Sequence, residues 1–120
     1  MPALGRLVLI VFVAAILFVA FVMYLTATAH AGGIASFYGR EHQGGPVACG
    51  GRFNMYAMTA AHRTLPCGTR VRVTHGRRSI VVTITDRGPW IRGRIIDLSD
   101  AARRAIGMGG TAYVELQVIK

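Results

Sequence analysis

Apolar and polar residues are distributed differently in the two parts of the chain. Residues 7–25 form an apolar run without a charged side chain, whereas apolar and polar positions alternate in several segments of residues 32–120. Alternation with a period of two is typical of strands that have one face buried. The pattern therefore predicts an apolar leader followed by a small domain built mainly from strands.

The expected strands are bounded by glycine and proline. We expect strands at residues 33–38, 69–74, 79–85, 94–96 and 111–119, with the short apolar segment 58–62 as a sixth. Residues 39–54 hold five glycines and predict a long surface loop. Ser99 is a suitable N-cap for one short helix over residues 100–106. Because a closed barrel removes exposed strand edges, the predicted fold class is a small, mainly-β barrel with one helix.

The apolar run has the features of an export signal. Arg6 precedes it, and Ala29-His30-Ala31 places small residues at both positions of an A-x-A cleavage site. We expect residues 1–31 to be removed, with the domain beginning at Gly32. The alternative is an uncleaved membrane anchor through residues 7–25, because about 20 apolar residues suffice to cross a bilayer. Both alternatives place residues 32–120 outside the cytoplasm.

The length and the charge of the chain limit the classes of function that it can have. A chain of 120 residues has room for one small domain and excludes a multidomain enzyme. Residues 32–120 hold 13 basic residues against 5 acidic ones, a difference of +8. Such a surface suits an anionic partner. Export makes nucleic acid a poor fit, because little nucleic acid is present outside the cytoplasm.

The two cysteines, Cys49 and Cys67, allow three interpretations. In an exported domain an even number of cysteines favours a disulfide, and closing this loop would stabilise the fold by about 3 kcal/mol. The alternatives are two buried thiols, or a zinc site, which the lack of a CxxC pair disfavours. We expect the disulfide and no metal.

Four stretches taken together are similar to one family. They are ASFYG at residues 35–39, MTAAHRTLP at 58–66, DRGP at 86–89 and RIIDLS at 94–99. In this order they resemble the rare lipoprotein A (RlpA)-like domain, a six-stranded double-psi β-barrel that also occurs in expansins and barwin-like proteins. The resemblance covers residues 33–120. It implies a protein of the periplasm or cell envelope that acts on peptidoglycan glycan strands, and we expect a monomer without a cofactor.

Enzymes of this family cleave glycan strands without water and leave 1,6-anhydro-muramic acid ends. The reaction requires one carboxylic acid that protonates the glycosidic oxygen. The resulting carboxylate then takes the proton of the C6 hydroxyl as that oxygen closes the ring. The sequence must therefore provide a carboxyl group in a cleft.

Three of the five acidic residues have simpler explanations than catalysis. Glu41 lies in the glycine-rich loop and Glu115 in an alternating strand, where both are expected to face water. Asp100 fits the first turn of the helix, where a negative charge is favourable. Asp86 and Asp97 therefore remain as the candidates.

Asp86 and Asp97 are the predicted catalytic residues. Asp86 follows a β-branched strand and precedes a break, which places it at the rim of the barrel, where it either faces a cleft or caps the turn. Asp97 lies between two apolar residues, and burial there would raise its pKa; its alternative role is an internal hydrogen bond. The resemblance implies Asp86 as the acid, with Asp97 second.

Four further residues are predicted to bind the substrate. Tyr38 and Trp90 offer flat rings to sugars, and Arg87 adjoins Asp86. His62 is expected to line the cleft, or else to be a half-buried histidine bonded to the backbone.

One position departs from the family pattern. Enzymes of the family carry a glutamate where this chain has Gly51. Residues 48–50 (ACG) instead resemble expansin and barwin-like domains, and the paired cysteines support the disulfide. The alternative function is therefore a non-catalytic, expansin-like module that binds or loosens glycan.

Overall fold

The computed structural model describes residues 2–28 and 30–119, which fall into two units that separate near His30. The N-terminal unit contains helix α1 (Pro2–Thr28), whose large apolar side chains between residues 7 and 21 are exposed. In the described part of the chain, no helix meets both the length and the hydropathy that a membrane span requires. The expected cleavage site includes Ala29, which lies outside the described residues.

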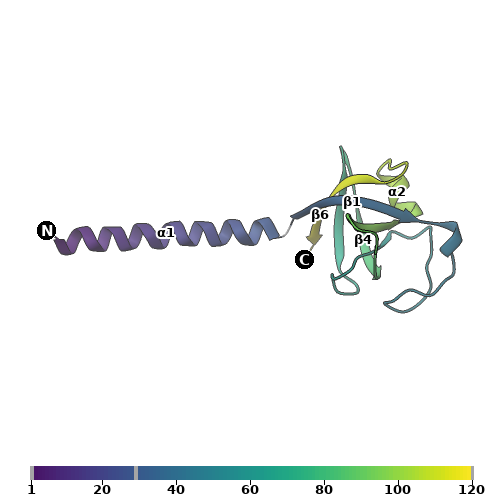
Figure 1. Cartoon of the computed structure of the whole chain (residues 1–120), viewed down its shortest axis with the longest axis horizontal. Coiled ribbons are helices and arrows are strands. Elements are labelled where there is room, and N and C mark those ends of the chain that lie inside the picture. Colours follow the sequence, from purple (N-terminus) through teal and green to yellow (C-terminus); the bar gives the residue numbers. More distant parts are fainter. Residues whose placement is uncertain (1, 29, 120) are drawn as a thin grey trace. The chain divides into compact units, whose positions relative to one another are not determined.

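The C-terminal unit is a closed barrel with one short helix (Figure 1). Its elements are β1 (His30–Tyr38), the 3-10 helix η1 (Arg40–His42), β2 (Thr59–Ala61), β3 (Arg70–His75), β4 (Arg78–Asp86), β5 (Arg94–Ser99), α2 (Asp100–Ala105) and β6 (Ala112–Ile119). Around the barrel the strands follow the order β1-β5-β2-β4-β3-β6. The pairs β1–β5 and β2–β4 are parallel, whereas β2–β5, β3–β4 and β3–β6 are antiparallel. The predicted fold class is confirmed.

The interior of the barrel is filled by the apolar side chains that alternate along the strands. Val71 and Val73 of β3, together with Val82 and Ile84 of β4, are fully buried. Burying one such side chain contributes about 1.5–3 kcal/mol relative to leaving it in water. The packed interior therefore fixes the strands that carry the candidate site.

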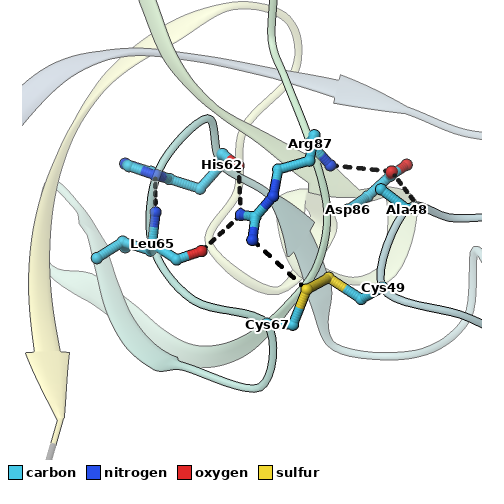
Figure 2. Close-up of a disulfide and its surroundings, with 7 residues drawn as sticks. All are labelled: Ala48, Cys49, His62, Leu65, Cys67, Asp86 and Arg87. Carbon is cyan, nitrogen blue, oxygen red and sulfur yellow. Dashed lines mark hydrogen bonds between the residues drawn. A yellow bond between two sulfur atoms is a disulfide. The ribbon is translucent and has the colours of Figure 1, made fainter.

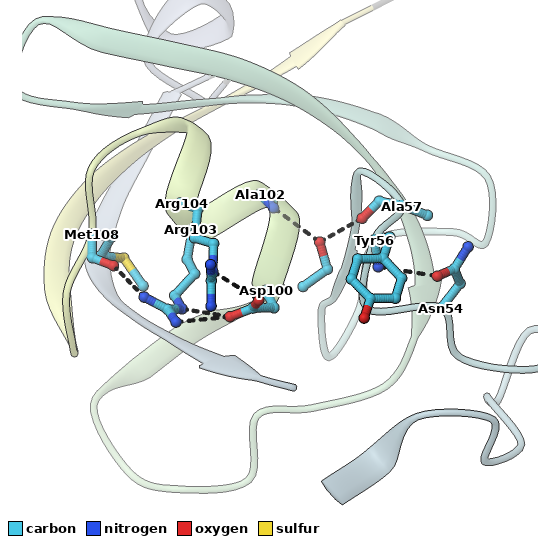
Figure 3. A network of polar contacts seen from close by, with 9 residues as sticks. Asn54, Tyr56, Ala57, Asp100, Ala102, Arg103, Arg104 and Met108 are labelled. Atoms are coloured by element: carbon cyan, nitrogen blue, oxygen red, sulfur yellow. Dashed lines mark hydrogen bonds and ion pairs between the residues drawn. The ribbon is translucent and has the colours of Figure 1, made fainter. Parts of the chain in front are cut away.

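Helix α2 begins as the sequence predicts. Ser99 is its N-cap, and the Ser99 hydroxyl accepts the N–H of Ala102 at 3.2 Å. The carboxylate of Asp100 pairs with Arg103 at 2.8 Å and with Arg104 at 2.9 Å (Figure 3). Asp100 is thus a structural residue of the first turn, as expected.

Strand β5 is longer than predicted. The predicted strand covers residues 94–96 and stops before Asp97, whereas β5 continues to Ser99. The extension arises because Leu98 is fully buried in the barrel and pairs with Ala60 of β2. Asp97 is therefore inside the strand, and its side chain projects from the opposite face.

Candidate active site

Four residues form one row across four neighbouring strands, which we call the outer row. Ser36 of β1 is the register partner of Asp97 on β5. Asp97 is in turn the partner of Ala61 on β2, and Ala61 is the partner of Asp86 on β4. The two aspartates therefore lie on either side of Ala61, with Cα atoms about 10 Å apart for a strand spacing of about 4.8 Å.

A shift of register turns Asp86 toward this row. Ala60 is paired with Ile84, but the next residue, Ala61, is paired with Asp86, so that Thr85 has no partner on β2. Without the extra residue, Asp86 would share the inward face of Ile84, because side chains alternate along a strand. A β-bulge re-aims a side chain in this manner, frequently beside an active site.

The outer row borders a cleft of about 390 Å³, which we call the aspartate cleft. It is lined by Tyr38, Glu41, His42, Gln43, Gly45, Pro46, Val47, Phe53, Ala61, Asp86, Arg87 and Asp97. The small side chain of Ala61 leaves space between the two carboxyl groups. Phe53 from the glycine-rich loop packs against Tyr38 with ring centroids 4.3 Å apart, and this contact holds the loop beside the strands.

The environment of Asp97 favours its protonated form. Burial raises the pKa of Asp97, and the negative charge of Asp86 raises it further. The Ser36 hydroxyl donates a hydrogen bond to Asp97 Oδ1 at 3.1 Å and lowers the pKa, as do the charges of His42 and Arg94. Burial is the largest of these effects, so the expected direction of the shift is confirmed.

Asp86 is held by two backbone N–H groups. Its Oδ1 accepts the N–H of Ala48 at 2.8 Å and the N–H of Arg87 at 2.9 Å (Figure 2). Both donors reach the same oxygen, and Oδ2 accepts no hydrogen bond from the described residues. Asp86 therefore caps the turn, as one alternative proposed, and at the same time lines the cleft.

Two aromatic residues predicted to bind substrate lie at the cleft or beside it. Tyr38 is 7% exposed, and within the described residues its hydroxyl has no hydrogen-bond partner. Burial and the charges of both aspartates raise the pKa of Tyr38, so this hydroxyl stays a donor at neutral pH. Trp90 is 74% exposed and lines an adjoining pocket of about 340 Å³ together with Tyr38 and Asp97.

Arg87 and His62 are engaged mainly with the protein itself. Arg87 lines both hollows, but its guanidinium donates to the carbonyl oxygens of His62 at 3.1 Å and Leu65 at 2.5 Å. His62 lies outside both sets of lining residues, and its Nδ1 accepts the N–H groups of Thr64 and Leu65 at 3.1 Å each. Burial lowers the pKa of His62, with help from the charges of Arg63 and Arg87. The backbone-bonded alternative accounts for these contacts.

The predicted disulfide is confirmed: Cys49 and Cys67 are bonded, with Cα atoms 5.7 Å apart.

Gly51, at the position of the family glutamate, is exposed and has φ +86°, a conformation that residues with a Cβ rarely adopt. In the described part of the chain, no three His, Cys, Asp or Glu side chains gather closely enough to hold a metal ion.

Two residues that the sequence did not predict to be functional, Glu41 and His42, also lie at the site. Both are exposed, as expected for the loop, yet both line the aspartate cleft and the pocket beside Trp90. They reach this position because η1 follows β1 directly after Gly39. The available signal was their closeness in sequence to Tyr38, a residue already assigned to the cleft.

Comparison with known proteins gives a family match and several relatives. A family model described as lytic transglycolase matches residues 30–118. The probable endolytic peptidoglycan transglycosylase RlpA of Nostoc sp. is 60% identical over 93 residues, which cover 72% of this chain and 25% of that protein. The protein of the same description from Synechocystis sp. is 55% identical, with 74% and 29% covered. The chain thus spans between a quarter and a third of these relatives' length.

Solved structures share the barrel. The Streptomyces papain inhibitor has a TM-score of 0.63 and 23% identity, and the match covers 76% of this chain and 94% of that one. The apo form of the Clavibacter michiganensis expansin has a TM-score of 0.62 and 23% identity, with 76% and 50% covered. At these identities the likeness concerns the fold alone.

Proposed function

The chain belongs to the lytic transglycolase family, and from this premise we propose that it cleaves peptidoglycan glycan strands without water, leaving 1,6-anhydro-muramic acid ends. The observation that carries the proposal is the outer row, in which two carboxyl groups flank a small residue in one cleft. The names of the relatives from Nostoc sp. and Synechocystis sp. agree with this activity.

Asp97 and Asp86 have different roles in the proposed reaction, and their order is the reverse of the one that the resemblance implies: Asp97 is the proton donor and Asp86 the stabilising anion. The raised pKa of Asp97 supports its role as the member that begins with a proton, which it gives to the glycosidic oxygen as the bond to the anomeric carbon breaks. The negative charge of Asp86 then stabilises the positive charge at that carbon.

The second step of the proposed reaction takes place within the sugar. The C6 oxygen attacks the anomeric carbon and forms the anhydro ring, while its proton passes to the carboxylate that gave one up. Glycosidases that use water need a second carboxylate as nucleophile or base. Intramolecular attack removes this need, so one proton-transferring carboxyl group suffices for the proposed step.

Binding depends on the barrel surface. The exposed ring of Trp90 offers a face on which a sugar can stack, and Tyr38 lines the same pocket. The excess of basic residues suits the lactyl and stem-peptide carboxylates of peptidoglycan.

The proposed activity requires export. In this proposal, residues 1–31 act as the export signal and the domain works in the periplasm or cell envelope as a monomer. Sequencing the N-terminus of the secreted protein tests cleavage after Ala31, because an uncleaved anchor would keep the residues that precede Gly32. Size-exclusion chromatography with light scattering tests the monomer.

The proposed reaction is tested on purified glycan strands with mass spectrometry of the products. Wild-type protein is expected to release anhydro-ended fragments, and Asp86→Asn is expected to release far fewer. Glu115→Gln is the matched control, because it also removes one negative charge but lies on the exposed face of β6. Wild-type binding without any anhydro product would favour the expansin-like alternative and reject the enzyme.

A further inference from the structure

A closed ring of contacts passes through the carboxylate of Asp86 (Figure 2). Its Oδ1 accepts the N–H of Ala48, the residue before Cys49, and the N–H of Arg87. Cys49 is joined to Cys67 by the disulfide, and the Arg87 guanidinium lies 3.5 Å from Cys67 Sγ. The ring thus begins and ends at one catalytic candidate.

On the loop side, the disulfide is the strongest attachment of the segment that carries Ala48. Ala48, Gly50 and Gly51 are exposed, whereas Val47 and Cys49 are half-buried, and Val47 packs against the small apolar cluster that contains Tyr38 and Phe53. The N–H of Cys49 also donates to the carbonyl of Thr85 at 3.1 Å. A segment with so few buried apolar contacts opens easily unless it is covalently held.

On the other side, Arg87 fixes the turn that carries Cys67. Its planar guanidinium donates to the carbonyl oxygens of both His62 and Leu65, a geometry that the single ammonium group of lysine does not reproduce. His62 Nδ1 accepts two N–H groups of the same turn. The sulfur of Cys67 is therefore anchored to the residue that follows Asp86.

We propose that the Cys49–Cys67 disulfide and the Arg87 guanidinium are positioning groups for the Asp86 carboxylate, so that turnover depends on the oxidised bridge. The inference rests on the proposed function. A dithiol can reach the exposed Cys67: it passes two electrons and two protons to the bridge, which becomes two thiols, while the dithiol becomes a disulfide. Ala48 is then free to leave Asp86, and a misplacement of about 1 Å can cost about 100-fold in rate.

The first test compares the full chain before and after treatment with dithiothreitol. Reduction is expected to lower kcat about 10- to 100-fold and to leave KM within about 2-fold. The double variant Cys49→Ser/Cys67→Ser is expected to have the same kcat as the reduced protein, and dithiothreitol is expected to leave its kcat unchanged. Circular dichroism fixes an assay temperature at which every form is folded. An unchanged kcat after complete reduction, verified by thiol titration, would overturn the proposal.

Substitutions of Arg87 distinguish a positioning role of this residue from a role in substrate binding. Arg87→Gln is expected to lower kcat at nearly constant KM, and Arg87→Lys to restore only part of the loss. A raised KM with unchanged kcat would instead assign Arg87 to the substrate and contradict its positioning role. Val71→Ala is the matched control, because it weakens the barrel core and lowers Tm but is expected to leave kcat unchanged.

A measurement that does not depend on activity tests this inference separately from the proposed function. Hydrogen exchange reports the bond from the Ala48 N–H to Asp86 directly. We expect the Ala48 amide to exchange at least about 10-fold faster in the reduced than in the oxidised protein. If wild-type protein forms no product, the proposed function fails, and this exchange alone decides the inference: equal rates in the two states would overturn it.

Discussion

Adjacent residues of β1, β5, β2 and β4 form two rows that face opposite ways. The inner row packs in or against the barrel core and consists of Phe37, Leu98, Ala60 and Ile84. The outer row supports or lines the aspartate cleft and consists of Ser36, Asp97, Ala61 and Asp86. One step along each strand thus separates the residues that stabilise the barrel from those that carry the proposed chemistry.

The comparison teaches how so small a domain can hold two carboxyl groups close to a core. The inner row fixes the backbone by burying apolar surface, and the same backbone fixes the outer row by register. Substitutions in the outer row should therefore change activity much more than stability, and substitutions in the inner row should do the reverse.

The largest effect is expected for Asp97→Asn. Asparagine keeps the size of the side chain and can still accept the hydrogen bond from Ser36, but it has no carboxyl proton to donate. We expect the rate of glycan cleavage to fall about 10²- to 10⁴-fold, with little change in Tm, as measured by product analysis and calorimetry. A variant that retained wild-type turnover would break the assignment of chemistry to the outer row.

Leu98→Ala tests the inner row. Leu98 is fully buried, and its truncation should lower the free energy of unfolding by about 2–5 kcal/mol, measured by urea titration. At a temperature where the variant is folded, its kcat should match that of the wild type. A large loss of kcat in folded protein would show that the two rows are not separable.

Ala61→Leu sharpens the comparison by filling the space between the two aspartates. The larger side chain enters the aspartate cleft, and we expect the Kd for glycan fragments to rise about tenfold or more. Isothermal titration measures the affinity, and Ala61→Gly is the control that should still bind. Undiminished affinity of the leucine variant would place the substrate elsewhere on the barrel.

The smallest effect is expected for Ser36→Ala. The Ser36 hydroxyl lowers the pKa of Asp97, so its removal should raise that pKa further. Because the proton donor must be protonated, the decline of activity at high pH should move to higher pH, as measured by a pH–rate profile. A decline that moved to lower pH would contradict the assignment.

The pKa of Asp97 also fixes the sign of a stability effect. A pKa raised by folding contributes stability that is fully present below the unfolded-state pKa and is lost as pH rises through the folded-state pKa. Asp97→Asn should remove this dependence in urea titrations at several pH values.

Several features could be predicted from the sequence because they depend on neighbouring residues. Alternation located the strands, the cap at Ser99 located α2, and the motif around Asp86 placed this residue at the rim of the barrel. The two cysteines predicted the bridge that the structure contains.

The remaining features depend on pairing between distant strands. The extra residue at Thr85, which turns Asp86 outward, leaves no mark in a uniformly β-branched run. The extension of β5 follows from the contact of Leu98 with Ala60, and Glu41 reaches the cleft only because η1 folds back after β1. Local patterns carry no information on such contacts.

The central claim is that one cleft holds two interacting carboxyl groups, those of Asp86 and Asp97. An NMR titration of the aspartate side-chain carbons tests this claim most directly. The pKa of Asp97 should lie above the ordinary aspartate value in the wild type. In Asp86→Asn it should fall but stay raised, since burial is its largest cause. An Asp97 that titrates at the ordinary value, or is indifferent to Asp86→Asn, would contradict the account.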